Sequence, residues 1–136
     1  MPQDNVEIVR AVYEAAARRD AASVLALYDP AVELDASAIA LGGLVGQPVR
    51  HGHEGVRSFF RELHEAYENL TYDLEELIPV GDRVISFVTR RGRGRLSRVE
   101  VEMSFAIAWT VRHGRIVKLE WFASREQARE AVAGGG

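Results

Sequence analysis

The chain has 136 residues, of which 47% are hydrophobic and 27% charged, and its formal net charge is −3. This length fits one domain with a real core, and the near-neutral charge argues against nucleic acid as the main partner. The absence of cysteine excludes disulfide scaffolds, thiol nucleophiles and thiolate metal sites. We find no signal peptide and no bilayer-length apolar run, so we expect a cytoplasmic protein with no membrane partner.

The N-terminal third of the chain is mainly helical in its spacing. Asp4 caps a helix that we expect to end near Arg19, and Asp20 caps a second, short helix. A short strand is expected over residues 32–35. The segment 36–50 has no clear period and is rich in glycine, which predicts a loop that is either mobile or functional.

A third helix begins near residue 53 and is followed by strands. Its wide apolar stripe consists of Val56, Phe59, Phe60, Leu63, Tyr67 and Leu70. The spacing then changes to two and predicts four strands joined by short turns, over residues 71–78, 83–90, 99–111 and 115–123. The strand 99–111 is long enough to expect a bend or bulge. Ser124 opens a short C-terminal helix, and we expect one domain over 1–133 with a disordered glycine tail at 134–136.

This order of elements predicts an α+β fold. Four strands joined by short turns form an antiparallel meander, and the helices gather on one face of it. A strongly curved antiparallel sheet closed by three helices makes a cone with an open mouth. Cavities of that kind bind small molecules.

Five segments carry this order in a specific pattern: Ala11-Val12-Tyr13, Leu25-Ala26-Leu27-Tyr28, Val32-Glu33-Leu34-Asp35, Gly52-His53-Glu54-Gly55-Val56-Arg57 and His113-Gly114-Arg115-Ile116-Val117. With them the chain resembles the nuclear transport factor 2-like superfamily (cystatin-like fold), and within it the SnoaL-like proteins, with ketosteroid isomerase as a more distant relative. The resemblance spans residues 6–123 and implies the cone fold. It leaves the chemistry open, because this superfamily includes isomerases, dehydratases, cyclases, epoxide hydrolases and pure binding modules.

Tyr13 and Asp35 are the candidate catalytic residues. The resemblance to ketosteroid isomerase places Tyr13 as the oxyanion-hole tyrosine and Asp35 as the general base, but Ala106 falls where that enzyme has a protonated aspartic acid. The isomerase machinery is therefore incomplete. One base and one phenol donor still permit proton abstraction from an activated substrate. Alternatively, Tyr13 is a packing residue and Asp35 forms a turn at the end of its strand.

The candidate ligand-binding residues form an apolar lining with a few polar groups. The apolar members are Leu41, Phe59, Phe60, Leu63, Leu119 and Trp121. Glu102 and Ser104 join them if their strand face points into the cone, which we favour from the resemblance. The apolar row opposite then lies on the outer sheet face and predicts a homodimer: Met103, Phe105, Ile107 and Trp109. In the alternative, Glu102 is solvated and this row is core.

Two histidines and a cluster of arginines are weaker candidates for functional sites. His51 and His53 have no third ligand at a recognised spacing, so we predict no metal site, with His51 the one expected to reach the cavity mouth. The alternative is a polar cap at a helix start. The arginines between Arg90 and Arg98 lack interleaved aromatic residues and predict a solvated hairpin, without nucleic-acid binding.

These observations predict a SnoaL-like protein that binds a small, mostly apolar organic ligand and needs no cofactor. If it is an enzyme, we expect acid–base chemistry of the isomerase, cyclase or dehydratase type. The alternative is a non-catalytic binding module or a dimeric accessory module. The polar content of the cavity discriminates between the two, because an acid beside a hydrogen-bond donor permits chemistry.

Overall fold

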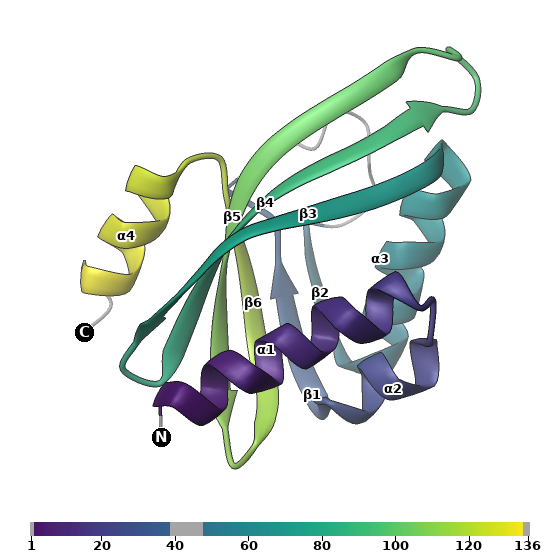
Figure 1. Ribbon diagram of the computed structural model, residues 1–136. Coiled ribbons are helices and arrows are strands. Elements are labelled where there is room, and N and C mark those ends of the chain that lie inside the picture. Colours follow the sequence, from purple (N-terminus) through teal and green to yellow (C-terminus); the bar gives the residue numbers. More distant parts are fainter. Residues whose placement is uncertain (1, 39–47, 135–136) are drawn as a thin grey trace.

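The computed structural model describes residues 2–38 and 48–134 (Figure 1). Within them the helices are α1 (Pro2–Ala17), α2 (Ala21–Ala26), α3 (Gly52–Ala66) and α4 (Arg125–Gly134). The strands are β1 (Tyr28–Asp35), β2 (Val49–His51), β3 (Tyr67–Val80), β4 (Arg83–Gly94), β5 (Glu100–Arg112) and β6 (Arg115–Phe122). They form one sheet in the order β2-β1-β6-β5-β4-β3, in which β1 and β6 run parallel and the other neighbours antiparallel.

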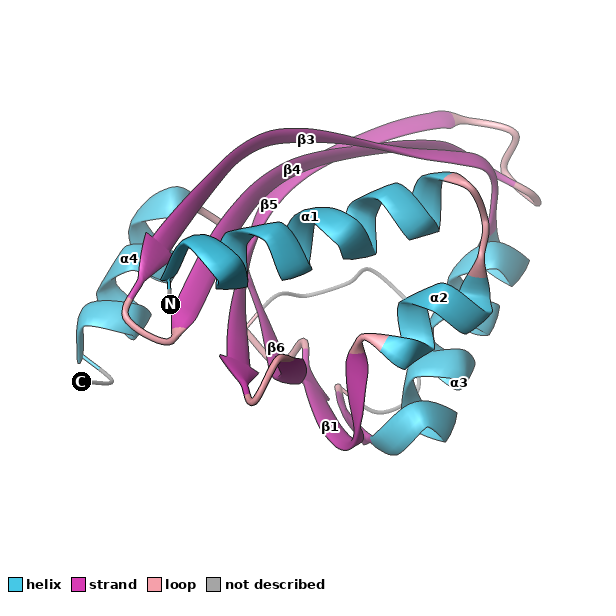
Figure 2. Cartoon of the chain, turned by 60° about the horizontal axis from the view of Figure 1, so that its bottom comes forward, coloured by secondary structure: helices cyan, strands magenta, loops and turns pink. Residues whose placement is uncertain are grey.

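The sheet is strongly curved and remains open. Figure 2 shows α1 lying beneath the arch of β3, β4 and β5, with α2 and α3 towards one end and α4 on the other side of the sheet. This arrangement confirms the α+β cone predicted from the sequence, with α4 as a fourth helix outside it. None of the helices in the described part of the chain is long and apolar enough to cross a membrane.

Some boundaries differ from the expectation. The third helix ends at Ala66, because Tyr67 takes an extended conformation (φ −131°, ψ 147°) and begins β3. Two residues assigned to the helical stripe, Tyr67 and Leu70, therefore lie in a strand. The short strand β2 begins within the segment 36–50 predicted as a loop and ends one residue beyond it. α4 extends through Gly134, the first residue of the predicted glycine tail, and residues 135–136 lie outside the described part.

Two apolar clusters lie on opposite sides of the sheet. The inner face, which we define as the side covered by α1 and α3, includes Phe105, Ile107, Trp109, Leu119 and Trp121. The outer face is the other side. There, small residues of β5 pack with larger ones of β4 and β6 against α4, in a cluster of Ile85, Phe87, Ala106, Ala108, Phe122, Ala128 and Val132. The middle of β5 is thus buried on both of its faces.

The orientation of β5 that the resemblance favoured is wrong, because Phe105, Ile107 and Trp109 belong to the inner cluster. A register irregularity lies between Thr110 and Val111, and beyond it Trp109 pairs with Leu119. Without that shift Trp109 would pair with Lys118 and share its face. A slip of one residue exchanges the two faces of a strand. Trp109 therefore lies on the inner face together with Leu119.

The residues expected inside the cone from this strand accordingly lie outside it. The side chain of Glu102 is 62% exposed and pairs with Arg91 at 2.9 Å. The hydroxyl of Ser104 lies 2.9 Å from that of Thr89 on the same outer face. The apolar row from Met103 to Trp109 is covered by helices within the chain, so it offers no dimer surface. The homodimer itself stays a prediction.

Candidate functional site

A small polar cluster lies in the apolar inner face. Tyr13 occupies the inward stripe of α1 together with Val9 and Val12, and Ser86 and Trp109 lie on β4 and β5. The Ser86 hydroxyl oxygen lies 2.8 Å from the Tyr13 hydroxyl and accepts a hydrogen bond of 2.8 Å from the indole N–H of Trp109.

This cluster has more donor hydrogens than hydrogen bonds between its members. Tyr13, Ser86 and Trp109 each bring one donor hydrogen, and two hydrogen bonds join them. The indole N–H can only donate, so Ser86 accepts from it. Either Ser86 then donates to Tyr13 and leaves the phenol hydrogen over, or Tyr13 donates to Ser86 and leaves the serine hydrogen over. In both cases one O–H hydrogen has no acceptor among the residues that the structure describes.

Burial keeps the phenol protonated. Desolvation raises the pKa of Tyr13 well above its usual range, and the hydrogen bond to Ser86 offsets only part of this rise. A neutral phenol in an apolar surrounding is a hydrogen-bond donor, and it is suited to a carbonyl or an oxyanion of a bound molecule. The ring of Tyr13 is held by an edge-on contact with Trp109, with the ring centroids 5.6 Å apart.

Asp35 does not join this cluster. On β1 the alternate residues Val32 and Leu34 belong to the inner cluster, as does Ala36 directly after the strand. Asp35 therefore lies on the outer face, where it is in register with Glu120. Its carboxylate accepts hydrogen bonds from the backbone N–H of Ser37 at 2.9 Å and from its hydroxyl at 2.5 Å. The expected pair of base and donor is therefore separated by the sheet, and Asp35 takes the turn-forming alternative.

The predicted apolar lining occupies one end of the inner face. The Phe59 ring lies 5.3 Å from that of Phe60 and 5.2 Å from that of Trp121, measured between ring centroids. Leu63 and Leu119 are each 1% exposed. Their role in binding stays a prediction, and Leu41 lies outside the described residues.

A partly exposed ion pair stabilises the same end, with the side chain of Arg50 10% and that of Glu62 37% exposed. The guanidinium of Arg50 donates to both carboxylate oxygens of Glu62, at 2.6 and 3.0 Å, and lies 5.6 Å from the Phe59 ring centroid. This hydrogen bonding lowers the pKa of the Glu62 carboxyl. Since β2 carries Arg50 and α3 carries Glu62, the pair fixes the edge of the sheet to the helix.

The two histidines, His51 and His53, make different contacts and do not form a common site. His51 is exposed and sits 3.4 Å from Glu33 on the outer face, away from the inner cluster. His53 places its Nε2 2.9 Å from the carbonyl oxygen of Tyr28, an arrangement that ties α3 to β1. The described part of the chain contains no group of three or more acidic or histidine side chains placed to hold a metal ion.

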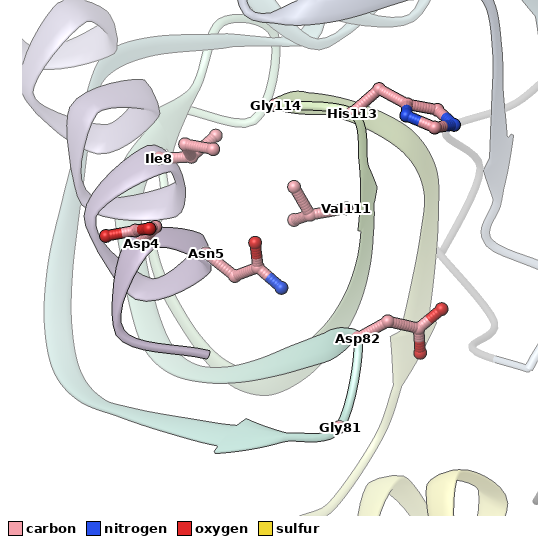
Figure 3. A pocket seen from close by; sticks show the side chains of 8 residues that line it. All are labelled: Asp4, Asn5, Ile8, Gly81, Asp82, Val111, His113 and Gly114. Atoms are coloured by element: carbon pink, nitrogen blue, oxygen red, sulfur yellow. The ribbon is translucent and has the colours of Figure 1, made fainter. Parts of the chain in front are cut away.

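A pocket of about 610 Å³ lies at the opposite end of the molecule (Figure 3). It is bordered by the first turns of α1 and by two hairpin turns. Ile8 and Val111 point into it, whereas the carboxylate of Asp82 and the imidazole of His113 point away from its centre. Its ionisable groups therefore do not converge on one point, and none of the residues predicted for the site lines it.

Sequence reasoning missed three residues of the inner face. Ser86 and Arg90 alternate with Val84 and Val88 on β4, and Trp109 faces Val84 from β5. Ser86 and Arg90 could have been found from the sequence, because they occupy alternate positions with Val84 and Val88 and so share their face of the strand. Alternation along β4 separates Arg90 from its exposed neighbours, so the expectation of a solvated hairpin is wrong for Arg90, which is buried.

The SnoaL-like domain matches residues 9–119, and the chain belongs to that family. No curated protein matches the chain.

Solved structures share the whole fold. TerC, co-crystallized with polyporic acid, is 25% identical, with 96% of this chain and 98% of that chain covered and a TM-score of 0.78. An NTF2-like protein from Burkholderia thailandensis is 29% identical, with 93% and 95% covered and a TM-score of 0.78. An NTF2-like protein of unknown function from Burkholderia pseudomallei is 28% identical, with 95% and 97% covered and a TM-score of 0.77.

Proposed function

We propose that the protein binds a small, mostly apolar organic molecule against the inner face of the sheet, where it accepts a hydrogen bond from the Tyr13–Ser86 pair. The observation that carries this proposal is the unused hydroxyl proton of the cluster. A buried donor without an acceptor is costly, and a ligand oxygen would satisfy it. The co-crystal of TerC with an organic acid supports the same class of ligand.

Binding without proton transfer is the form of this function that we favour. The carboxylate expected to act as base is bound to Ser37 on the outer face. The hydrogen bond described for the Tyr13 hydroxyl joins it to Ser86, which is no base at neutral pH. The phenol thus serves recognition of a ligand oxygen.

The neutral naphthyl ketone Prodan tests this proposal, because its fluorescence emission shifts to the red when its carbonyl accepts a hydrogen bond. We expect Prodan to bind the wild-type protein. In Tyr13→Phe the affinity should fall by about 3- to 10-fold, the equivalent of one lost hydrogen bond. The emission of the bound probe should also shift to the blue.

Tyr28→Phe is the matched control, since Tyr28 is 2% exposed and its ring also contacts Trp109, at 6.4 Å between centroids. It should change neither the affinity nor the emission. Equal effects of the two substitutions would contradict a specific role for the Tyr13 hydroxyl. Absence of Prodan binding to the folded wild-type protein would contradict the proposed function.

A further inference from the structure

Arg90 places a positive charge on the inner face. It lies on β4, four residues beyond Ser86 and with the same parity, so strand geometry separates their Cα atoms by about 13 Å. Arg90 is only 8% exposed. Its guanidinium carbon lies 5.8 Å from the ring centroid of Tyr67 and 5.7 Å from that of Phe105, and one N–H points to the sulfur of Met103 at 3.7 Å.

Among residues 2–38 and 48–134, no acidic side chain pairs with this charge. Its exposed neighbours pair on the outer face, Arg91 with Asp73 and Glu102, and Arg93 with Glu100. Arg90 itself has no carboxylate within ion-pair distance among the residues that the structure describes. The stretch 39–47, outside that set, contains neither aspartate nor glutamate.

A buried guanidinium without a counter-charge is expensive to keep. Folded proteins nearly always pair such a group, and the two aromatic rings supply only a weak cation–π attraction. The charge also acts on the inner face: Tyr72 lies opposite Arg90 on β3, and the arginine counteracts part of the rise that burial causes in the pKa of Tyr72. An anion approaching this face would therefore be attracted to Arg90.

We propose that Arg90 binds the anionic oxygen group of an aromatic ligand, such as a carboxylate, a sulfonate or an acidic enol. The flanking rings of Tyr67 and Phe105 form the aromatic wall beside that group. The inference rests on the proposed function and narrows its ligand class to aromatic acids. A guanidinium suits this role because its planar donors match two oxygens at once.

Two fluorescent probes with the same aromatic skeleton test the inference: anilinonaphthalene sulfonate, which is an anion, and N-phenylnaphthylamine, which is neutral. Both should bind the wild-type protein. In Arg90→Gln the dissociation constant of the anionic probe should rise by about 10-fold or more, the loss of a hydrogen bond to a charged group. That of the neutral probe should stay within about 2-fold.

Arg91→Gln is the matched control, because it removes an arginine from the adjacent position and the opposite face. It should affect neither probe. Arg90→Lys keeps the charge but loses the planar arrangement of donors. It should therefore lower the affinity for the anionic probe less than Arg90→Gln does. Displacement of the neutral probe from the wild-type protein, with naphthoate outcompeting naphthamide, tests the charge without any substitution.

The outcomes separate the two proposals. If Arg90→Gln lowered the affinity for both probes equally, Arg90 would have a structural role, and the inference would be overturned. An unchanged affinity for the anionic probe, or naphthoate no better than naphthamide, would overturn it as well. In each of these cases binding of the neutral probe leaves the proposed function standing. If the wild-type protein bound neither of these probes nor Prodan, both proposals would be overturned.

Discussion

The hydroxyl of Ser86 should stabilise the fold as well as support the site. Ser86 is fully buried, and its oxygen serves both the indole N–H of Trp109 and the hydroxyl of Tyr13 at 2.8 Å. In Ser86→Ala both partners lose this oxygen where water does not reach them, at about 1–3 kcal/mol for each group. The expected loss is therefore about 2–6 kcal/mol in the free energy of unfolding. At several degrees per kcal/mol this lowers the melting temperature by roughly 10 °C or more.

Urea unfolding and thermal unfolding of the two proteins measure this loss. Thr89→Ala is the control, since Thr89 is also buried but makes its hydrogen bonds to Glu75 and Ser104 on the outer face, whose side chains reach solvent. It should cost about 1 kcal/mol. A Ser86→Ala variant as stable as this control, with an unshifted indole N–H resonance for Trp109, would refute the proposed hydrogen-bond cluster.

Two further predictions concern the Arg50–Glu62 ion pair and the first residue of α3, Gly52. Since Arg50 lowers the pKa of Glu62, their pair stabilises the fold above the unfolded carboxyl pKa of about 4.3 and is lost as pH falls through the lowered value. Glu62→Gln should therefore lower the melting temperature near neutral pH but not near pH 2; an equal difference at both pH values would contradict this. Gly52 has φ +73° and leaves 3.2 Å between an added Cβ and the carbonyl oxygen of Pro30. Gly52→Ala should cost about 1–2 kcal/mol of unfolding free energy, more than Gly81→Ala at φ +61° in open space, and equal costs would show that the contact is harmless.

The sequence predicted the fold well where charges mark one side of an element. On β6, Lys118 and Glu120 alternate with Leu119 and Trp121, so the charged residues identify the solvent side. The change of period after the third helix likewise predicted the meander. The boundary at Tyr67 was missed because an apolar residue at helical spacing fits the first position of a strand equally well.

On β5 the same rule applies only at the start of the strand, where Glu100 and Glu102 mark the outer face, and the resemblance that we followed favoured the opposite orientation. From Phe105 to Val111 both of its faces are buried, so no charge marks either one. The size of the side chains carried the information: Ala106 and Ala108 leave room for α4, and the large residues between them fill the concave side. The hairpin turn alone would have misled, because the irregularity before Val111 shifts the register by one residue.

The residues of the candidate site follow the same alternation between the inner and outer faces of the sheet. On β4 the inner row alternates between apolar and polar residues: Val84, Ser86, Val88 and Arg90. The partners of these residues on β5 are all apolar: Trp109, Ile107, Phe105 and Met103. A row that served packing alone would gain stability from apolar residues at all four positions, because each buried polar group carries a desolvation cost. The two polar positions are the ones with unused hydrogen-bonding or charge capacity, a donor hydroxyl at one and a cation at the other. Local departures from core rules of this kind concentrate at functional sites, and the ligand that we propose, with an acceptor oxygen and an acidic group, would satisfy both positions.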